Sequence, residues 1–525
     1  MKSTCIALIS MFCINLGAQD FEKTMTVSPG TSVRIETGTV FGADTLTLKS
    51  SSSKFATVLT DVDGLTSGAV VNYDRYVNVV GESSVNGGND LVALPLKDGA
   101  ATFADFLTYS DDGGTTTNAD YMVTSPTTST LYAFGPFDTA NYTYINYDSS
   151  ADGAEELLRG KGYRAATASG RTLRFTGSIT TNIVTTDIIT GTYSRWNLIG
   201  NPYPTYLDSE AFLTANSDEL DQDALAIYGY NSGTNASSVG TIGNYTIINY
   251  NTNTDLNIAP GQGFYVANDP SVSSNTVTFS PAMRLFNGGD DFIAGRDANN
   301  QMLRLKVAQA NTDFATEFYF NDNSTQALDP GYDAKLFGAS SLGFSLYSHL
   351  VADNQGTAMA IQSLGSSDLS SVVIPLGLKA GEGQQITFSI ENSTLASDVS
   401  VYLEDTVANT VTLLNNTDYT FTTNSAISGT GRFYLNIGNA TLSQVDDELN
   451  NLNLYAAQKT IVVTGQLVEA TEMTVYDTLG RKVMFSTLET GSNANEVDAS
   501  QLTAGIYIVT LENVTQELSK KVILK

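Results

Sequence analysis

The sequence Asn-Tyr-Thr-Tyr-Ile-Asn-Tyr at residues 141–147 returns as Asn-Tyr-Thr-Ile-Ile-Asn-Tyr at residues 244–250. Four neighbouring motifs return in the same order, each displaced by about 100 residues. They are Leu91–Pro95 with Leu198–Pro202, Phe106–Thr108 with Phe212–Thr214, Gly160–Tyr163 with Gly261–Phe264, and Leu173–Phe175 with Val277–Phe279. Because this unit is far longer than a solenoid repeat, we expect two copies of one β-rich module, at 81–186 and 187–290. They form either separate domains or two halves of a pseudo-symmetric sandwich.

Each copy is expected to combine strands with one short helix. In the second copy, Trp196–Gly200 is an apolar strand that Asn201-Pro-Tyr-Pro204 ends, because proline cannot donate to a strand ladder. Asp208 or Ser209 is placed to cap a short helix that runs to Asn216. Further strands are expected at Ala224–Tyr230, Tyr245–Tyr250 and Gly263–Ala267. The Gly-x-Gly motif before the last strand predicts a tight turn or bulge, and it is no dinucleotide loop because no helix follows it.

The composition favours strands throughout the chain. Hydrophobic residues make up 42% of the 525 residues and charged residues only 15%, against about 25% in an average soluble domain. Thr, Val, Tyr, Phe and Ile suit a pleated, half-buried surface. We therefore predict an all-β, multidomain protein of β-sandwich modules. Besides the repeats, these are a β-rich cap at 19–80, an antiparallel β-sandwich at 296–440, a linker at 441–450, and a small immunoglobulin-like β-sandwich at 451–525.

The region 296–440 shows the period of two that is typical of half-buried strands. The alternating segments are Leu303–Val307, Glu317–Phe320, Ile386–Ile390, Val401–Leu403 and Phe433–Ile437. Asn415-Asn416 and Ser428-Gly429 predict turns between strands. Several short strands at regular spacing are typical of a sandwich.

Residues 1–18 predict a signal peptide. Lys2 supplies a positive start, and Ile6–Leu16 is an apolar run too short to span a bilayer comfortably. Cys5 and Cys13, the only two cysteines, lie in this segment, so a mature chain from Gln19 has no disulfide and no thiolate metal site. No later apolar stretch is long enough for a transmembrane helix.

The formal net charge is −29 and the pI is about 4.2. Such a field repels phosphate backbones, which excludes nucleic acid as an expected partner. The charge either serves solubility outside the cell or provides acidic loops for calcium, the one cofactor that we consider.

Asp148-x-Ser150-x-Asp152-Gly153 resembles the start of a calcium loop. The acid expected at the twelfth position is instead Arg159, which departs from that pattern. Asp61 and Asp63 form a second acidic turn of the same kind. Both segments are equally explained as turns, where Asp and Gly tolerate the backbone angles.

Aromatic residues are plentiful, with 26 Tyr and 23 Phe. Tyr142, Tyr144 and Tyr147 share a short strand region, as do Tyr245 and Tyr250, and alternation places Tyr142 and Tyr144 on one face. An exposed row of aromatic rings could stack on sugars, whereas a row packed against a facing sheet is core. The single histidine, His349, is expected at the surface or in a turn, and no pair of carboxylates stands out as catalytic.

The segments that distinguish residues 451–525 are Leu454-Tyr455, Val475-Tyr-Asp477, Leu479-Gly-Arg481, Leu502-x-x-Gly505-x-Tyr507-x-Val509 and Lys521-Val-Ile-Leu-Lys525. Together and in this order they resemble the type A C-terminal sorting domain of cargo proteins of the Bacteroidetes type IX secretion pathway. The resemblance implies that the outer-membrane translocon recognises the folded domain. The domain is usually cut off, within or beside 439–451 here, as the cargo is released or attached to surface lipopolysaccharide. Leu502, Gly505, Tyr507, Val509, Lys521 and Lys525 are the expected sorting motif.

The middle of the chain also resembles a recurrent architecture in exported proteins of the same bacteria. The segments that carry this resemblance are Trp196–Pro202, Gly261–Phe264, Phe279–Ala282, Ile374–Gly377, Tyr402–Asp405 and Arg432-Phe433. The resemblance implies no particular chemistry. We expect an extracellular or surface protein with a non-enzymatic structural or adhesive body, and the alternative is a carbohydrate-binding protein or polysaccharide hydrolase that uses glycans as its partners.

Overall fold

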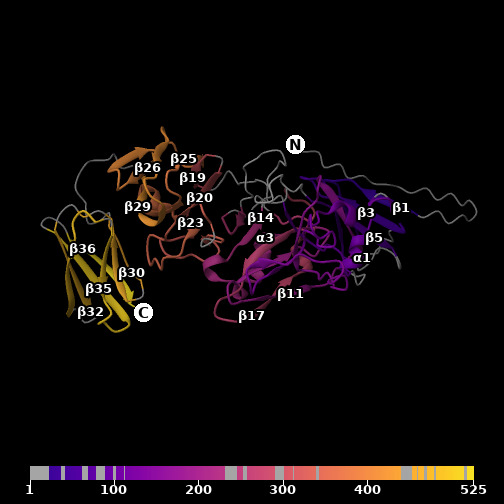
Figure 1. Cartoon of the computed structure of the whole chain (residues 1–525), viewed down its shortest axis with the longest axis horizontal. Coiled ribbons are helices and arrows are strands. Elements are labelled where there is room, and N and C mark those ends of the chain that lie inside the picture. Colours follow the sequence, from indigo (N-terminus) through magenta and orange to yellow (C-terminus); the bar gives the residue numbers. More distant parts are fainter. Residues whose placement is uncertain are drawn as a thin grey trace, which may run out of the picture.

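The computed structural model describes residues 23–524, except for 37–41, 62–68, 78–88, 98–101, 112, 231–244, 252–256, 290–300, 311, 339–341, 439–451, 458, 466, 468–469, 478–480, 493 and 514–516. Strands dominate the described chain, which confirms the all-β prediction. Figure 1 shows the N-terminal part and the repeats at one end of the long axis, a third part beside them, and the C-terminal sandwich at the other end. The predicted signal peptide at 1–18 and linker at 441–450 lie outside the described residues and stay predictions.

The N-terminal part winds as stacked coils. Its strands are β1 (Thr24–Val27), β2 (Ser32–Ile35), β3 (Thr45–Lys49), β4 (Thr57–Thr60) and β5 (Val70–Val77). β1, β3 and β5 pair in parallel, as do β2 and β4, so the chain returns to the same direction after each coil. The other edge of β5 pairs with β10 (Arg171–Gly177) of the first repeat. One hydrophobic core therefore runs through the predicted cap and the first repeat, from Val27 and Tyr73 to Phe106 and Phe175.

The two repeats build the same sheet twice. The strand order is β6 (Asp90–Ala93), β9 (Gly162–Ala165), β7 (Phe134–Asp138), β8 (Thr143–Tyr144) in the first copy, and β12 (Trp196–Gly200), β16 (Gly263–Ala267), β14 (Ile227–Tyr230), β15 (Tyr245–Ile248) in the second. A short helix follows the first strand of each copy, namely α1 (Phe103–Thr108) and α3 (Ser209–Ala215). Asp208 caps α3 and Asn216 ends it, so the predicted helix is confirmed.

Short elements complete both copies. They are α2 (Asn118–Tyr121), β11 (Val184–Ile189), β13 (Tyr206–Leu207), η1 (Ser217–Glu219), η2 (Gln222–Ala224), β17 (Ser274–Phe279), η3 (Pro281–Met283) and β18 (Arg284–Leu285). β11 pairs with β17 and β13 pairs with β18, so the second copy closes on itself through strands at both of its ends.

The copies meet through contacts that occur twice with the copies exchanged. Val92 forms a β-bridge with Gln262, and Lys161 forms one with Ile199. In the repeat alignment Val92 corresponds to Ile199 and Lys161 corresponds to Gln262. The two bridges are therefore the same contact seen from either copy. This geometry is that of two halves of one pseudo-symmetric unit.

The Gly-x-Gly motifs make this seam possible. The first glycine of each motif has a left-handed φ, +75° at Gly160 and +63° at Gly261. The Gly160 carbonyl accepts a hydrogen bond from an N–H of β12 at 3.0 Å, and the Gly261 carbonyl accepts one from an N–H of β6 at 2.8 Å. A Cβ on Gly162 would lie 2.6 Å from a backbone oxygen of β12, and one on Gly263 would lie 2.9 Å from a backbone carbon of β6. The predicted turn is present, and side chains are excluded because two backbones approach each other there.

A buried polar pair lies at the centre of the seam. The Gln262 side chain donates to the carbonyl oxygens of Leu91 and Gly263 at 3.0 and 3.1 Å. Its oxygen accepts a hydrogen bond from the guanidinium of Arg75, which is fully buried on β5. That guanidinium also lies 4.6 Å above the Phe55 ring. The N-terminal coils and both repeats are thus joined at one point.

The third part is an eleven-stranded sheet around one core. Its elements are β19 (Gln301–Gln309), β20 (Thr312–Asn321), β21 (Ala334–Lys335), β22 (Ser345–Ser348), β23 (Met359–Gly365), η4 (Ser366–Ser370), β24 (Ser371–Ala380), β25 (Gln385–Ser393), β26 (Ser400–Asp405), β27 (Thr410–Leu413), β28 (Tyr419–Thr422) and β29 (Ile427–Gly438). All five segments that the alternation predicted as strands lie within these strands.

Two details of the third part differ from expectation. β20 and β23 pair in parallel, since a long connection carries the chain back before β23 begins, and the sandwich is therefore not wholly antiparallel. The turn predicted at Ser428-Gly429 is wrong, because both residues lie inside β29. Gly429 has a φ of +120° and pairs across a bulge in β24, so the glycine accommodates a strand irregularity and not a chain reversal.

A buried ion pair fastens the edge of this sheet. Asp405 is 1% exposed and accepts two hydrogen bonds from the Arg432 guanidinium, at 2.7 and 2.9 Å. The Tyr419 hydroxyl donates to the same carboxylate at 2.8 Å. The guanidinium lies 4.4 Å from the Phe421 ring and 4.8 Å from the Phe433 ring. Since every partner is paired, removing one would leave a buried charge uncompensated.

Two buried titratable groups of the third part have shifted pKa values. His349 lies just after β22, beside the Tyr347 ring. It is 9% exposed, so the expectation of a surface position for this histidine is wrong. Burial lowers the pKa of His349 to about 4. Asp333 is fully buried, and burial raises its pKa to about 7, although the backbone N–H groups of Ser363 and Asp329 donate to its carboxylate.

The C-terminal part is a separate two-sheet sandwich, as predicted. One sheet contains β30 (Asn453–Ala457), β31 (Thr460–Thr464) and β34 (Ala494–Asp498). The other has the order β33 (Lys482–Leu488), β32 (Thr471–Asp477), β35 (Gly505–Glu512), β36 (Glu517–Leu524). Within the described residues these strands pair only with one another, and their core is built from residues 452–524 alone. The sandwich is therefore complete in itself.

We predict that Gly162→Ala and Gly263→Ala each destabilise the repeat unit by about 1–3 kcal/mol, because the new methyl group overpacks the seam. Gly42→Ala is the matched control, since a Cβ there meets nothing within 4 Å. Urea unfolding of the full chain can be followed by the fluorescence of its single tryptophan, Trp196 in β12. Unchanged midpoints for both seam variants would contradict this account.

We predict opposite pH effects for the two buried titratable groups. His349 has a folded pKa of about 4 against an ordinary 6.5, so the unfolded state takes up the proton first and stability falls as the pH drops from 6.5 to 4. Asp333 has a folded pKa of about 7 against an ordinary 3.8, so the folded state holds the proton and stability rises over 7 to 4. At most, the effect amounts to about 3 kcal/mol for His349 and about 4 kcal/mol for Asp333.

Urea midpoints by circular dichroism between pH 7.5 and 4.5 test these signs in the full chain. Acidification should cost His349→Gln less stability than the wild type, and should cost Asp333→Asn more. The reverse order for either variant would refute the assignment for that group.

Candidate functional sites

Aromatic rings gather where both repeats meet the third part, and the rings joined by the contacts described below are here called the aromatic junction. They are Phe137, Tyr142, Tyr144, Trp196, Tyr228, Tyr265 and Phe337. Phe337 follows β21 of the third part, and its ring centre lies 4.7 Å from that of Trp196, 5.0 Å from Tyr265, 6.2 Å from Tyr228 and 6.5 Å from Tyr142. One phenylalanine of the third part thus inserts among rings supplied by both copies.

Tyr142 and Tyr144 are half-buried members of this junction. Their ring centres lie 5.6 and 5.4 Å from that of Phe137, and the Tyr144 hydroxyl is hydrogen-bonded to that of Tyr265. The Arg164 guanidinium lies 4.4 Å from the Tyr144 ring. Tyr142 was expected in a strand, but it lies in the turn before β8 and has a φ of +53°. Both side chains are therefore partly buried by contacts within the junction.

Tyr250, of the second predicted group of tyrosines, does not join this cluster. Tyr250 follows β15 and packs against the second repeat's core, with its ring centre 5.6 Å from that of Tyr332. Its N–H donates to the carbonyl of Gly331 at 2.7 Å. Tyr245 begins β15, and its side chain lies outside the described atoms. The residue that matches Tyr250 in the first copy is Tyr147, which likewise packs in the core of its own copy.

Buried amides seal the same boundary on its polar side. The amides of Asn249 and Asn251 both donate to the carbonyl of Tyr332, at 2.6 and 2.9 Å, and Asn251 also donates to the Ser363 hydroxyl. In the first copy the residue that matches Asn249 is Asn146, which is exposed and accepts from Arg164. The sequence did not single out these asparagines, although the place of Asn249 in the repeated Ile-Asn-Tyr motif was a signal for that residue. Nothing in the sequence singled out Phe337.

The calcium-like segment forms a self-contained turn. The carboxylate of Asp148 accepts from the N–H and hydroxyl of Ser150 at 2.9 and 2.6 Å. These hydrogen bonds to Ser150 lower the pKa of Asp148. Asp152 accepts from the N–H of Asp148 at 2.8 Å. The turn is thus explained by its own backbone, and calcium binding stays a prediction.

Only one of the two acidic residues of the second predicted calcium turn, Asp61, is described. Asp61 is exposed and lies 3.8 Å from the Arg34 guanidinium, whereas Asp63 lies outside the described residues. Across the described residues, no three His, Cys, Asp or Glu side chains gather as a metal site requires. No helix in the described part of the chain is long and apolar enough to cross a bilayer.

The predicted sorting motif lies on the last two strands of the C-terminal sandwich. Tyr507 and Val509 point from β35 into its core, and the Tyr507 hydroxyl donates to the Thr503 carbonyl at 2.8 Å. Leu502 packs on this core just before Gly505 opens β35. Lys521 is exposed on β36, and Lys525 lies outside the described residues. Tyr507 and Val509 therefore build the fold, whereas Lys521 is on the surface.

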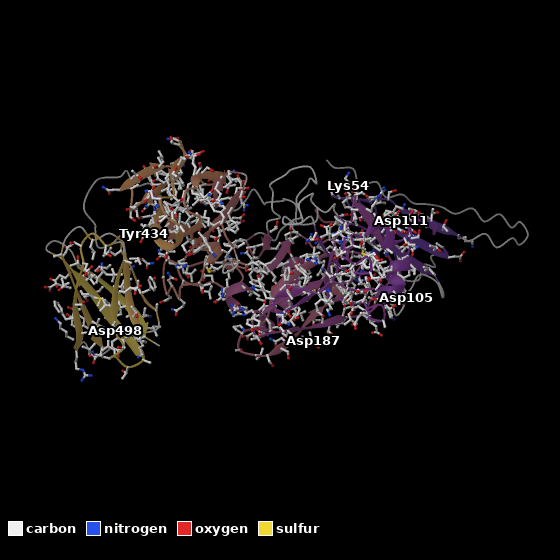
Figure 2. The ribbon with its side chains drawn as sticks, in the orientation of Figure 1. Lys54, Asp105, Asp111, Asp187, Tyr434 and Asp498 are labelled. Atoms are coloured by element: carbon white, nitrogen blue, oxygen red, sulfur yellow. The ribbon has the colours of Figure 1, made fainter. Side chains whose placement is uncertain are left out.

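The other sheet of this sandwich faces the third part. Tyr434 of β29 is 3% exposed and lies near Thr464 and Tyr455, and burial raises its pKa to about 12. In Figure 2 Tyr434 lies on the side of the third part that is turned toward the C-terminal sandwich. The body and the sandwich therefore touch at β29 on one side and at β30 and β31 on the other.

Comparison with known families agrees with this division. A secretion system C-terminal sorting domain matches residues 456–525, which confirms that the chain is a type IX secretion cargo protein. Its sorting domain marks it for export to the cell surface or the extracellular space. A search of curated proteins finds no match.

A second family covers the body. The family described as domain of unknown function (DUF8693) matches residues 15–436, which is most of the chain. This match spans the N-terminal coils, both repeats and the third part, so it treats them as one unit. The chain therefore belongs to the DUF8693 family, and a secretion system C-terminal sorting domain follows its body.

Proposed function

We propose that the body is a non-enzymatic structural or adhesive protein that the sorting domain delivers to the cell surface or the medium. The observation that carries this proposal is the aromatic junction. Phe137 of the first repeat, Tyr265 of the second and Phe337 of the third part place all three in one cluster, with ring centres 5.2 Å apart for Phe137 and Tyr265 and 5.0 Å apart for Tyr265 and Phe337. A body whose parts share buried interfaces keeps its shape, as a spacer or an adhesive rod must.

Two further features support a rigid body. The amides of Asn249 and Asn251 fasten the second repeat to the third part, and Gln262 with Arg75 fastens the repeats to the N-terminal coils. Each of these polar groups is buried and hydrogen-bonded, so separating the parts would exchange these bonds for bonds to water, at a net cost of about 0.5–1.5 kcal/mol for each bond. The route is proposed to be a signal peptide at 1–18, then the periplasm, then the translocon, with surface lipopolysaccharide as one final attachment.

Carbohydrate binding is the second candidate, and one observation favours it. Tyr142 holds a left-handed φ of +53°, which costs about 1–2 kcal/mol for a residue with a Cβ. Strained residues are enriched at binding sites. The half-open rings of Tyr142 and Tyr144, with Arg164 beside them, offer stacking and hydrogen-bonding groups to a sugar.

We predict that deleting residues 452–525 leaves the protein in the periplasm, because the translocon then has no sorting domain to recognise. Immunoblots of periplasm, cell surface and medium measure this in cells with a working type IX pathway. Gly42→Ala in the full chain is the control and should be exported normally. Normal appearance of the deletion variant in the medium would refute the proposed route.

We predict that the purified full chain shows no selective binding on a glycan array and no hydrolysis of polysaccharides. Selective binding that Tyr142→Ala with Tyr144→Ala abolishes, and that Tyr193→Ala retains, would establish carbohydrate binding instead. Tyr193 is the matched control because it is 75% exposed and outside the aromatic junction. Release of sugar from any polysaccharide would overturn the non-enzymatic assignment.

A further inference from the structure

The outer face of the four-stranded sheet in the sorting domain carries an apolar patch. Side chains alternate along a strand, so the inward Tyr507 and Val509 leave Ile506 and Ile508 pointing outward. Phe485, Ile506 and Ile523 are 47%, 46% and 43% exposed. The outer patch is defined here as Tyr476, Val483, Phe485, Ile506, Ile508 and Ile523.

The strand register makes this patch continuous. Ile506 pairs with Ile523 across β35 and β36, and Tyr476 pairs with Ile508 across β32 and β35. Val483 and Phe485 extend the patch onto β33, the neighbour of β32. Directly paired residues of antiparallel strands lie side by side on one face. The apolar side chains therefore cover all four strands.

Exposed apolar side chains are concentrated here. Of the 14 large hydrophobic side chains exposed in the described residues, five lie in this domain, and all five are in the outer patch. The rest are scattered over the much larger body. A contiguous apolar patch on a folded protein marks an interaction surface, whereas scattered exposed residues need no explanation.

The arrangement of the domain leaves this face open. The opposite sheet, at Thr464 and Tyr455, is the one that meets Tyr434 of the body. The family match assigns residues 456–525 to secretion sorting, so the domain has the secretion machinery as its partner. The open sheet is therefore the face available to that partner while the body is attached.

Charge distinguishes the rim of the outer patch. The Lys482 ammonium lies 4.2 Å from the centre of the Phe485 ring, and exposed Lys521 pairs with Ile508. Residues 452–525 contain eight acidic and six basic residues, whereas the whole chain has a net charge of −29. The domain is thus nearly neutral with lysines beside its apolar patch, which suits an apolar partner surface with carboxylates around it.

We propose that the outer patch, with Lys482 and Lys521, is the surface that the secretion machinery binds. The partner is a protein component that presents an apolar surface bordered by carboxylates. This proposal rests on the proposed export route and adds the binding face to it. The sorting-motif residues Tyr507 and Val509 then act indirectly, since they hold the sheet that displays Ile506 and Ile508.

The test is a triple variant of the full chain, Ile506→Thr with Ile508→Thr and Ile523→Thr. Threonine keeps the β-branched shape that strands favour and removes most of the apolar surface. The matched control is Glu472→Thr with Glu512→Thr, which changes exposed residues on β32 and β35 outside the patch. We expect the exported fraction of the triple variant to fall at least tenfold, with accumulation in the periplasm, and the control to be exported normally.

Folding and charge are measured alongside. Circular dichroism and limited proteolysis of the purified variants show whether the sandwich is intact, and Phe485→Thr on the edge strand replaces the triple variant if it is not. Lys482→Glu with Lys521→Glu should lower the exported fraction as well, because the reversed charges meet the partner's carboxylates.

Three outcomes are decisive. In the first outcome, the folded triple variant (or folded Phe485→Thr in its place) is exported at the wild-type level, while deletion of 452–525 still blocks export. This outcome would overturn the proposed face and leave the route intact. Export of the deletion variant would overturn the route itself. A wild-type dimer that the variant converts to a monomer without loss of export would assign the patch to a second copy of the chain and overturn the proposal.

Discussion

The close approach of two backbones at the seam between the repeats is the constraint on which the body depends. Gly162 and Gly263 leave no room for a side chain there, and the carbonyls of Gly160 and Gly261 accept hydrogen bonds from the opposite copy. This places Gln262 where Arg75 of the N-terminal coils can reach it. Because β12 is fixed at the same seam, Trp196 is also in position to receive Phe337 of the third part.

The sequence predicted the features whose causes are local. The helix from Asp208 to Asn216 follows from its cap, and the strands of the third part follow from alternation, because both signals lie within a few residues. The parallel pairing of β1 with β3, and of β20 with β23, depends on contacts between distant segments and has no local signal. The burial of His349 and the strand position of Ser428-Gly429 are of the same kind. A single histidine can be buried or exposed, and a Ser-Gly pair occurs both in turns and within strands, so neither residue type decides its own position.

The two repeats show how one motif can acquire two roles. Asn146 and Asn249 occupy the same place in the repeated Ile-Asn-Tyr motif, yet Asn146 is exposed and Asn249 is buried against Tyr332. The difference arises from the third part, which packs on the second copy. Repetition therefore predicted two copies of one β-rich module, but it could not predict which copy would be covered.

Strand geometry separates two kinds of information in the sorting domain. In Gly505-x-Tyr507-x-Val509 the residues that made the domain recognisable point into its core, and the unspecified positions between them, Ile506 and Ile508, point outward. A motif of alternating residues identifies the fold because the core restricts inward positions most. Outward positions are free to vary with the partner, so the motif alone cannot reveal a binding face. The structure is needed to show that Ile506 and Ile508 lie beside Tyr476, Lys521 and Ile523, where alternate positions of neighbouring strands form one surface.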